Sequence, residues 1–229
     1  RAAPALRPLF ILLCLPGASF LLYYFHFIQE PAWYVEFRSI PGIEVLSSLC
    51  GFLFGSFASR GLIMLRLAVL IAFVPFAKPI LLPLFPSQIR EAWREDVCLQ
   101  STAATCGPCS LATVMRSLEL PAKEGDVARA AFSAMTGTEN WYLIRHARSK
   151  GLEARFKYRT ALSEVVPPAI VGVRLGGEGG AGHFITYLGE QGSRRVIGDP
   201  LSGRFLLIDD QFAKTYTFAG TAIEFRRPQ

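Results

Sequence analysis

The pattern of apolar and polar residues divides the chain into two parts. In the first part, apolar side chains run almost without interruption and form three stretches, about residues 9–28, 45–60 and 62–85. At about 1.5 Å per residue, each is long enough for a helix that crosses most or all of a bilayer. Residues 45–77 can also be interpreted as one broken span, which leaves two crossings. The pattern predicts a transmembrane region with two to three helices over residues 1–86.

Two local patterns refine this first part. Gly51 and Gly55 stand four residues apart, a spacing that lets two helix backbones approach closely, although glycine is also common in membrane helices in general. Residues 87–96 are polar and charged, with Ile89 and Trp93 at helical spacing. We expect them to form a juxtamembrane connector at the membrane surface.

Residues 97–229 are expected to form one domain whose periodicity changes after Gly151. Apolar positions before it recur with a helical period, and Thr105 is placed to cap the first helix. Short β-rich runs separated by Gly, Pro and Asp turns follow it. Helices first and an antiparallel sheet afterwards predict an α+β domain. The expected helices are 105–118, 124–135 and 139–150, and the expected strands are 153–158, 169–175, 183–188, 195–197, 204–208 and 222–226.

Composition and charge narrow the classes of function. The chain is 51% hydrophobic with a net charge of +6, and residues 1–90 hold 7 basic but only 3 acidic residues. Basic residues that flank apolar segments are what membrane insertion selects, whereas a nucleic-acid-binding protein clusters them on a soluble face. We therefore expect the lipid bilayer as a partner, and no nucleic acid.

The charged residues also bear on topology. The loop between the first two apolar stretches carries Glu30, Glu36 and Glu44, so the positive-inside rule places this loop outside. Three spans then put the C-terminal domain outside, and two spans put it in the cytosol. The sequence starts at Arg1 rather than methionine, as expected of a fragment of a longer protein.

Four polar residues of the second part suggest a thiol hydrolase. Cys106 stands at a predicted helix N-terminus, where unpaired N–H groups and the helix dipole stabilise a thiolate. His183 begins an apolar strand and is placed to act as general base and then as acid. Asp199 ends the next strand and is placed to orient the imidazole. The Gln100 amide and the Cys106 backbone N–H would stabilise the oxyanion, an interaction worth roughly 3 kcal/mol.

Other chemistries compete for the same cysteine. Cys106 and Cys109 enclose Gly-Pro, which alone is a dithiol redox motif, and they could form a regulatory disulfide. A thioredoxin-like pair follows an apolar central strand, however, and residues 95–105 do not form one. Zinc binding by Cys98, Cys106, Cys109 and His183 matches no usual ligand spacing. The Gly-x-Gly-x-x-Gly match at 177–182 precedes a strand instead of opening a helix, so we expect a mobile loop beside the site, and no cofactor or metal.

Several short motifs occur in a fixed order along the second part. They are Gln100 to Leu111, Gly137-Thr138, Lys150-Gly151-Leu152, Pro168-Ala169-Ile170, Gly182-His183-Phe184-Ile185 and Gly198-Asp199-Pro200. In type, order and spacing they resemble the bacteriocin-processing, double-glycine peptidase family. The resemblance covers about residues 97–229. It implies a papain-like fold with Cys106 as nucleophile, His183 as base, Asp199 as orienting residue and Gln100 in the oxyanion hole.

The resemblance also implies a substrate and partners. Family members cut leader peptides after a Gly-Gly pair, and many are fused to an ATP-driven exporter. Here the membrane segments precede the peptidase, no phosphate-binding loop is present, and Thr105 and Cys109 replace an acidic and an apolar residue. We therefore predict a cysteine peptidase in a bacterial inner membrane that cuts a leader or precursor peptide, with a separate exporter as a further partner. The alternatives are a non-cleaving leader-binding domain and a membrane dithiol oxidoreductase.

Overall fold

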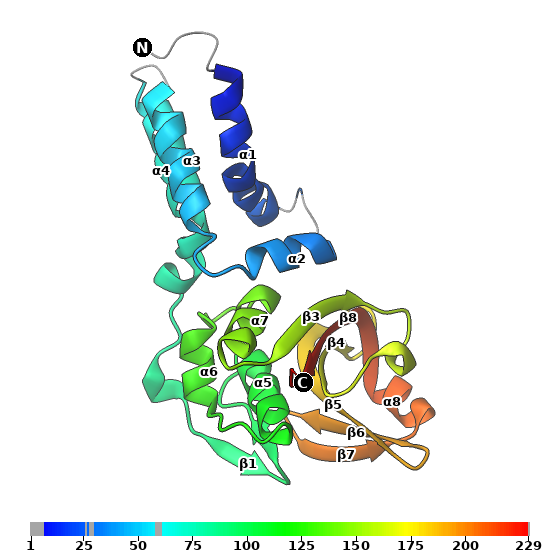
Figure 1. The fold of residues 1–229 in the computed structure, drawn as a ribbon. Helices are drawn as coiled ribbons and strands as arrows, with labels where there is room; N and C mark the ends of the chain where they lie inside the picture. The colour runs from blue at the N-terminus through cyan, green and yellow to red at the C-terminus, as the bar shows by residue number, and fades with distance from the viewer. Residues whose placement is uncertain (1–6, 26, 28–29, 58–60, 229) are drawn as a thin grey trace. The chain divides into compact units, whose positions relative to one another are not determined.

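The chain divides into two units, Arg1–Leu82 and Pro83–Gln229. The computed structural model describes residues 7–25, 27, 30–57 and 61–228 of the sequence (Figure 1). We refer to the two units as the N-terminal and the C-terminal unit.

The described part of the N-terminal unit contains four helices: α1 (Arg7–Tyr24), α2 (Ala32–Arg38), α3 (Val45–Phe57) and α4 (Leu62–Leu81). Three of them fall in the predicted apolar stretches, whose predicted ends at 28 and 60 lie outside the described residues. The short helix α2 was not predicted. It has only seven residues, and the charged residues in and around it were interpreted as a loop. Within the described residues, α4 is the one helix long and apolar enough to cross a membrane, by length and composition. Membrane insertion of the unit therefore stays a prediction.

The two spaced glycines of α3 serve helix packing. A Cβ atom on Gly51 would overlap the backbone of Ala68 and the side chain of Ala72, both on α4. A Cβ atom on Gly55 would lie 3.1 Å from the Ala68 side chain. The α3 and α4 backbones thus approach closely along this glycine face, as the small-residue spacing allows.

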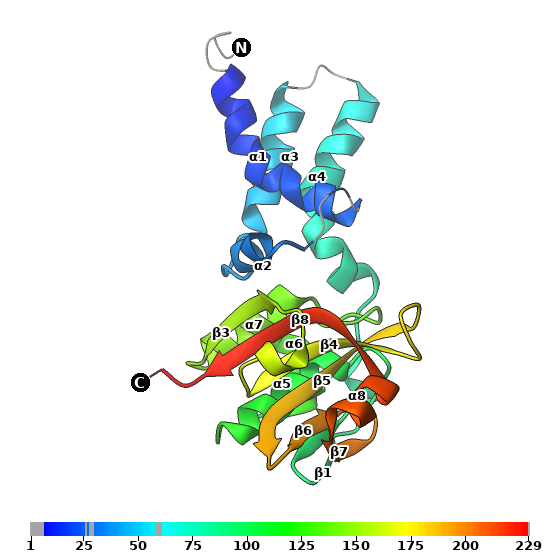
Figure 2. The ribbon, with the colours of Figure 1, turned by 90° about the vertical axis from the view of Figure 1, so that its right-hand side faces the viewer.

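The C-terminal unit has a helical layer and an antiparallel sheet. Three helices, α5 (Cys106–Ser117), α6 (Glu124–Ala130) and α7 (Asn140–Ser149), lie on one face of the sheet, and the short α8 (Asp209–Thr215) lies on the other (Figure 1, Figure 2). The six strands follow the order β3-β8-β4-β5-β6-β7, with all neighbours antiparallel. The strands are β3 (Glu153–Tyr158), β4 (Ala169–Leu175), β5 (Ala181–Gln191), β6 (Arg194–Asp199), β7 (Gly203–Leu207) and β8 (Tyr216–Arg226). This arrangement confirms the predicted α+β class.

The segment expected to be a connector with helical spacing is largely a β-hairpin. After a single 3-10 turn at Pro86–Gln88, strand β1 (Ala92–Arg94) pairs with β2 (Val97–Leu99). Glu95 and Asp96 have φ values of 47° and 63°, the left-handed values that a two-residue hairpin turn requires. Strand β2 packs against α5 and leads directly into the segment that carries Gln100.

Candidate active site

Cys106 is the first residue of α5, and the turn before it is closed by threonine side chains. The Thr105 hydroxyl donates to the Thr102 carbonyl at 3.0 Å and accepts the Thr102 N–H at 3.1 Å. The expected capping role of Thr105 is therefore wrong in detail, because its hydroxyl stabilises the preceding turn and makes no capping hydrogen bond to α5. The N-terminal amides of α5 have no side-chain cap, and they lie where negative charge at Cys106 would be stabilised.

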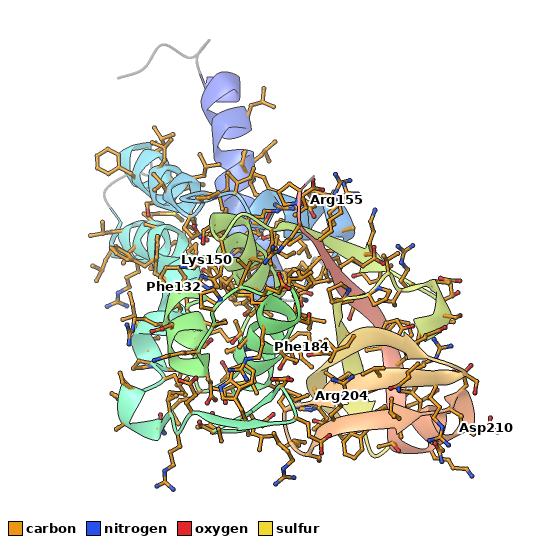
Figure 3. The ribbon with its side chains drawn as sticks, turned by 60° about the horizontal axis from the view of Figure 1, so that its bottom comes forward. Phe132, Lys150, Arg155, Phe184, Arg204 and Asp210 are labelled. Carbon is orange, nitrogen blue, oxygen red and sulfur yellow. The ribbon has the colours of Figure 1, made fainter. Side chains whose placement is uncertain are left out.

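Helix α5 is held against β5, the strand that carries His183. Ser110 donates its hydroxyl to the Phe184 carbonyl at 3.1 Å, and Thr186 donates to the Ser110 carbonyl at 3.3 Å. A Cβ atom on Gly107 would lie 3.4 Å from the ring of Phe184, which is labelled in Figure 3, so the start of α5 packs against this strand at van der Waals distance. The relative position of the cysteine helix and the histidine strand is thus fixed by the backbone as well as by side-chain packing.

His183 and Asp199 form a direct pair on neighbouring strands. His183 Nε2 lies 2.8 Å from Asp199 Oδ1, and each side chain is 5% exposed. His183 and Asp199 are 16 residues apart in the sequence. They meet because β5 and β6 pair antiparallel, with Thr186 opposite Gly198. The Cys106 thiol lies beside the same imidazole and interacts with it. The structure therefore brings the predicted cysteine, histidine and aspartate together.

The surroundings favour the charged forms of the pair. Burial alone lowers the pKa of His183, but hydrogen bonds with Asp199 and Cys106 outweigh it and raise the pKa to about 9. Burial alone raises the pKa of Asp199, but hydrogen bonds from His183, Tyr216 and the Leu201 amide outweigh it and lower the pKa. An imidazolium held by a carboxylate next to a thiol is the arrangement that favours a thiolate–imidazolium pair.

Asp199 receives two further hydrogen bonds that the sequence analysis missed. The Tyr216 hydroxyl donates to Oδ2 at 2.6 Å, and the Leu201 N–H donates to Oδ1 at 2.8 Å. The second bond has a sequence signal, because Asp followed by Pro is typical of a turn in which the carboxylate binds the amide two residues on. Tyr216 has no such signal, since it reaches Asp199 only through the pairing of β8 within the sheet.

Gln100 lies in the segment between β2 and the Thr102–Thr105 turn. Its backbone N–H donates to the Pro200 carbonyl at 2.8 Å, which joins this segment to the turn after Asp199. Its side-chain Nε2 donates to the Thr102 carbonyl at 2.9 Å, and Oε1 is buried without a hydrogen-bond partner among the described atoms. The reverse orientation would set two oxygen acceptors against each other, so the amide keeps Nε2 toward Thr102 with one N–H still available.

The Gln100 segment is also anchored by Glu124, a fully buried carboxylate on α6 that sequence analysis did not single out. Glu124 Oε1 accepts the Ser101 N–H at 2.8 Å, and Oε2 accepts the Ser101 hydroxyl at 2.5 Å. Helix α6 therefore fixes the residue that follows Gln100.

The Cys-Gly-Pro-Cys motif is divided between two different contacts. Cys106 lies beside His183, whereas Cys109 Sγ lies 3.1 Å from Cys98 Sγ on β2. In the structure the sulfur contact of Cys109 is therefore with Cys98, and a regulatory Cys106–Cys109 disulfide stays a prediction. Among the described residues, no group of three or more His, Cys, Asp or Glu side chains is placed to hold a metal ion. The Gly-rich match at 177–182 covers the hairpin turn between β4 and β5 and the first two residues of β5, directly before His183.

Comparison with known proteins identifies the family. The model of the peptidase C39 family matches residues 94–229. The chain belongs to the peptidase C39 family. It is therefore a cysteine peptidase, as the sequence motifs predicted.

Two relatives of similar sequence are proteins of Methanothermobacter. One, from Methanothermobacter marburgensis, is 33% identical over 123 residues, which cover 54% of this chain and 84% of the relative. The other, from Methanothermobacter thermautotrophicus, is 31% identical over 134 residues, 58% of this chain and 90% of the relative. Both matches span little more than half of this chain but most of the relative.

Two solved structures resemble part of the chain. One is a double glycine motif protease from an AMS/PCAT transporter in complex with the leader peptide. The match has a TM-score of 0.49 and 21% sequence identity, and it covers 64% of this chain and 99% of that chain. The other is the peptidase domain of Streptococcus ComA, a bifunctional ABC transporter involved in quorum sensing, with a TM-score of 0.48 and 22% identity over 57% and 96% of the two chains.

Proposed function

We propose that this peptidase is membrane-bound and hydrolyses a peptide bond in a leader or precursor peptide, after small residues such as Gly-Gly. The observation that carries the chemistry is the buried His183–Asp199 pair beside Cys106, at the N-terminus of α5. The order and spacing of the motifs that resemble double-glycine peptidases support the site of cleavage. The apolar helix α4 supports membrane attachment.

In the proposed mechanism, the Cys106 thiolate adds to the carbonyl carbon of the scissile bond. The resulting oxyanion accepts hydrogen bonds from the Cys106 backbone N–H and from the free N–H of Gln100 Nε2. His183, protonated in the resting pair, gives its proton to the leaving amine, and a thioester remains on Cys106. His183 then takes a proton from water as the water attacks the thioester, which releases the leader acid and restores the thiolate–imidazolium pair.

Asp199 supports both steps without touching the substrate. Its carboxylate holds Nε2 of His183, so Nδ1 is the imidazole nitrogen left to face the thiol. The negative charge also stabilises the imidazolium that both steps require. Because Asp199 is buried and bound by three donors, the imidazole has one orientation in the resting protein.

The test is a cleavage assay on the full chain with a synthetic peptide that carries Gly-Gly before a reporter segment, next to a peptide in which Leu-Leu replaces Gly-Gly. We expect cleavage of the first peptide only, and iodoacetamide labelling that maps to Cys106. Cys106→Ala should abolish both signals. Cys98→Ala is the matched control, because Cys98 is fully buried and lies outside the proposed catalytic group.

Each outcome bears on a separate part of the proposal. Cleavage that persists in Cys106→Ala would disprove the role of the nucleophile. Equal cleavage of both peptides would leave the peptidase chemistry in place but disprove the preference for small residues. Recovery of the active protein in the soluble fraction of cells, without detergent, would disprove membrane attachment.

A further inference from the structure

Cys98 and Cys109 form a sulfur pair next to the active site, and neither belongs to the proposed catalytic group. Cys98 is the middle residue of β2, and Cys109 lies one turn into α5. Their Sγ atoms are 3.1 Å apart, and both residues are 0% exposed. This separation is shorter than the sum of two sulfur van der Waals radii, so the two sulfurs already face each other in closer than ordinary contact.

Backbone contacts hold the two cysteines in this position. The Cys98 N–H donates to Thr113 Oγ1 at 3.0 Å, and Thr113 follows Cys109 by one helical turn on the same face of α5. Residue 198, opposite this face, is glycine, and a Cβ atom there would lie 3.1 Å from Val97 and 3.4 Å from Thr113. Strand, helix and sheet are therefore packed tightly around the sulfur pair.

The pair is unsuited to dithiol catalysis. Burial, the neighbouring Cys98 thiol and the Glu124 carboxylate all raise the pKa of Cys109, so the thiol stays protonated in the folded chain. A redox-active cysteine needs an accessible thiolate, and Cys109 has neither the charge nor the exposure. Its sulfur contact with Cys98 is therefore not that of a catalytic dithiol.

We propose that Cys98 and Cys109 form a structural disulfide, made by exchange with a disulfide oxidant while the segment that joins β2 to α5 is still open. The thiolate of one cysteine attacks the oxidant, which releases one thiol and leaves a mixed disulfide. The second cysteine then attacks its partner's sulfur and releases the other thiol. The two cysteines lose two protons and two electrons, and the oxidant disulfide is reduced to two thiols.

The bond requires little movement and closes a functional loop. The sulfurs need to approach by about 1 Å to reach the ~2.05 Å of a disulfide. The loop of 11 positions between the two cysteines contains Gln100 and Cys106. A disulfide here restricts the unfolded chain and joins the two ends of the segment that carries the proposed oxyanion donor and nucleophile, while the Cys106 thiol stays free.

The test maps sulfur linkage in the full chain, so its outcome does not depend on peptidase activity. The reduced protein is incubated with oxidised glutathione in sub-denaturing urea, and free thiols are then alkylated under denaturing conditions. Trypsin leaves all three cysteines of the C-terminal unit on the single peptide 95–116, because no Lys or Arg lies inside it. A second cleavage after Leu99 separates Cys98 from the other two.

We expect the two fragments to remain joined, with a mass two hydrogens below that of the separate thiols and an alkyl group on Cys106. The Cys106→Ala variant should show the same linkage without an alkyl group. Fragments that separate with every thiol alkylated would overturn the proposal. So would a bond between Cys106 and Cys109 inside one fragment, or a joined product in which Cys106 is not the alkylated residue.

A stability measurement tests the structural role. The oxidised chain should unfold at a temperature about 5 °C or more above that of the reduced chain. Cys98→Ala should show no difference between oxidising and reducing conditions. Equal unfolding temperatures for the oxidised and reduced wild-type chains would overturn the structural role. If Cys98→Ala fails to fold, the linkage map of the wild-type chain still decides whether the disulfide forms.

Discussion

Removing one hydroxyl group from Tyr216 would test how the active-site aspartate is held. The Tyr216 hydroxyl donates to Asp199 Oδ2 at 2.6 Å, and the two residues are only 3% and 4% exposed. Burial and this bond to the carboxylate raise the pKa of Tyr216, so the phenol stays a donor at neutral pH. Tyr216→Phe deletes the donor and leaves the ring in place, so packing changes little.

The expected magnitude follows from the charge of the acceptor. A hydrogen bond to a buried charged group contributes about 1.5–3 kcal/mol to folding. Asp199 keeps its bonds from His183 and the Leu201 amide, so we expect a loss of about 2 kcal/mol in the free energy of unfolding. The imidazole is still held, and kcat/KM should fall by about 10-fold, equivalent to ~1.4 kcal/mol.

The acid side of the stability profile gives a separate measure. The folded-state pKa of Asp199 is lowered, so its contribution is present above the unfolded pKa of about 3.9 and is lost as the pH falls through the folded value. Without the Tyr216 donor, the folded pKa of Asp199 rises toward its ordinary value. The variant should therefore lose stability to acid at a higher pH than the wild-type chain does.

Urea unfolding at several pH values and steady-state kinetics on the Gly-Gly peptide measure these effects. Tyr187→Phe is the matched control, since it removes a buried tyrosine hydroxyl from β5 that donates to the exposed Glu190 and accepts a long bond of 3.5 Å from Arg195. That loss should cost less than about 1 kcal/mol and leave the acid transition unchanged. If the two variants show the same acid transition and the same kcat/KM, the Tyr216 bond does not hold Asp199 in the way described.

Two further substitutions test the segment before Cys106. Gln100→Ala should lower kcat by about 100-fold or more with little change in KM, because an oxyanion donor acts in the transition state; an unchanged kcat on the Gly-Gly peptide would contradict this role. Glu124→Ala should lower the free energy of unfolding in urea by about 2–4 kcal/mol, because it leaves the Ser101 N–H without its acceptor. Ser101→Ala removes only the hydroxyl bond and should lower it by about 1 kcal/mol. Equal losses from these two variants would show that the amide contact contributes little.

The fold was predictable where short-range sequence patterns were strong. The β-rich runs at 153–158 and 169–175 have the bounds of β3 and β4, and the predicted helix 105–118 is one residue longer than α5 at each end. The sequence missed α8 and placed the start of the last strand at 222 rather than at Tyr216. Strand β8 contains Gly220 at a φ of 77° and pairs with both β3 and β4, with an irregular register along β4. Its first half, residues 216–218, pairs with β4 and not with β3, and this long-range pairing leaves no local pattern in the sequence.

In the candidate active site too, the residues with a local sequence signal could be predicted, and the residue placed only by long-range pairing could not. Cys106, His183 and Asp199 carry chemical signals of their own, such as a helix start, a strand start and an Asp-Pro turn. Tyr216 carries none, because an aromatic residue at a strand end is more often part of a core. Only the position of β8 within the sheet brings its hydroxyl to Asp199, and strand order is not encoded in any short motif.

The Cys-Gly-Pro-Cys motif was ambiguous because α5 is buried on every side from Cys106 to Met115, so no polar face shows which way each side chain points. Contacts in the folded chain show the direction of each cysteine. Residues four apart share a helix face, so each cysteine contacts the same strand as the residue four positions later. Cys106 and Ser110 both contact β5, through His183 and the Phe184 carbonyl. Cys109 and Thr113 both contact Cys98 on β2, one through its sulfur and the other through its backbone. Two cysteines three residues apart thus have different contact partners in the folded chain. A peptidase nucleophile and a structural sulfur pair can therefore occupy one motif without competing for the same thiol.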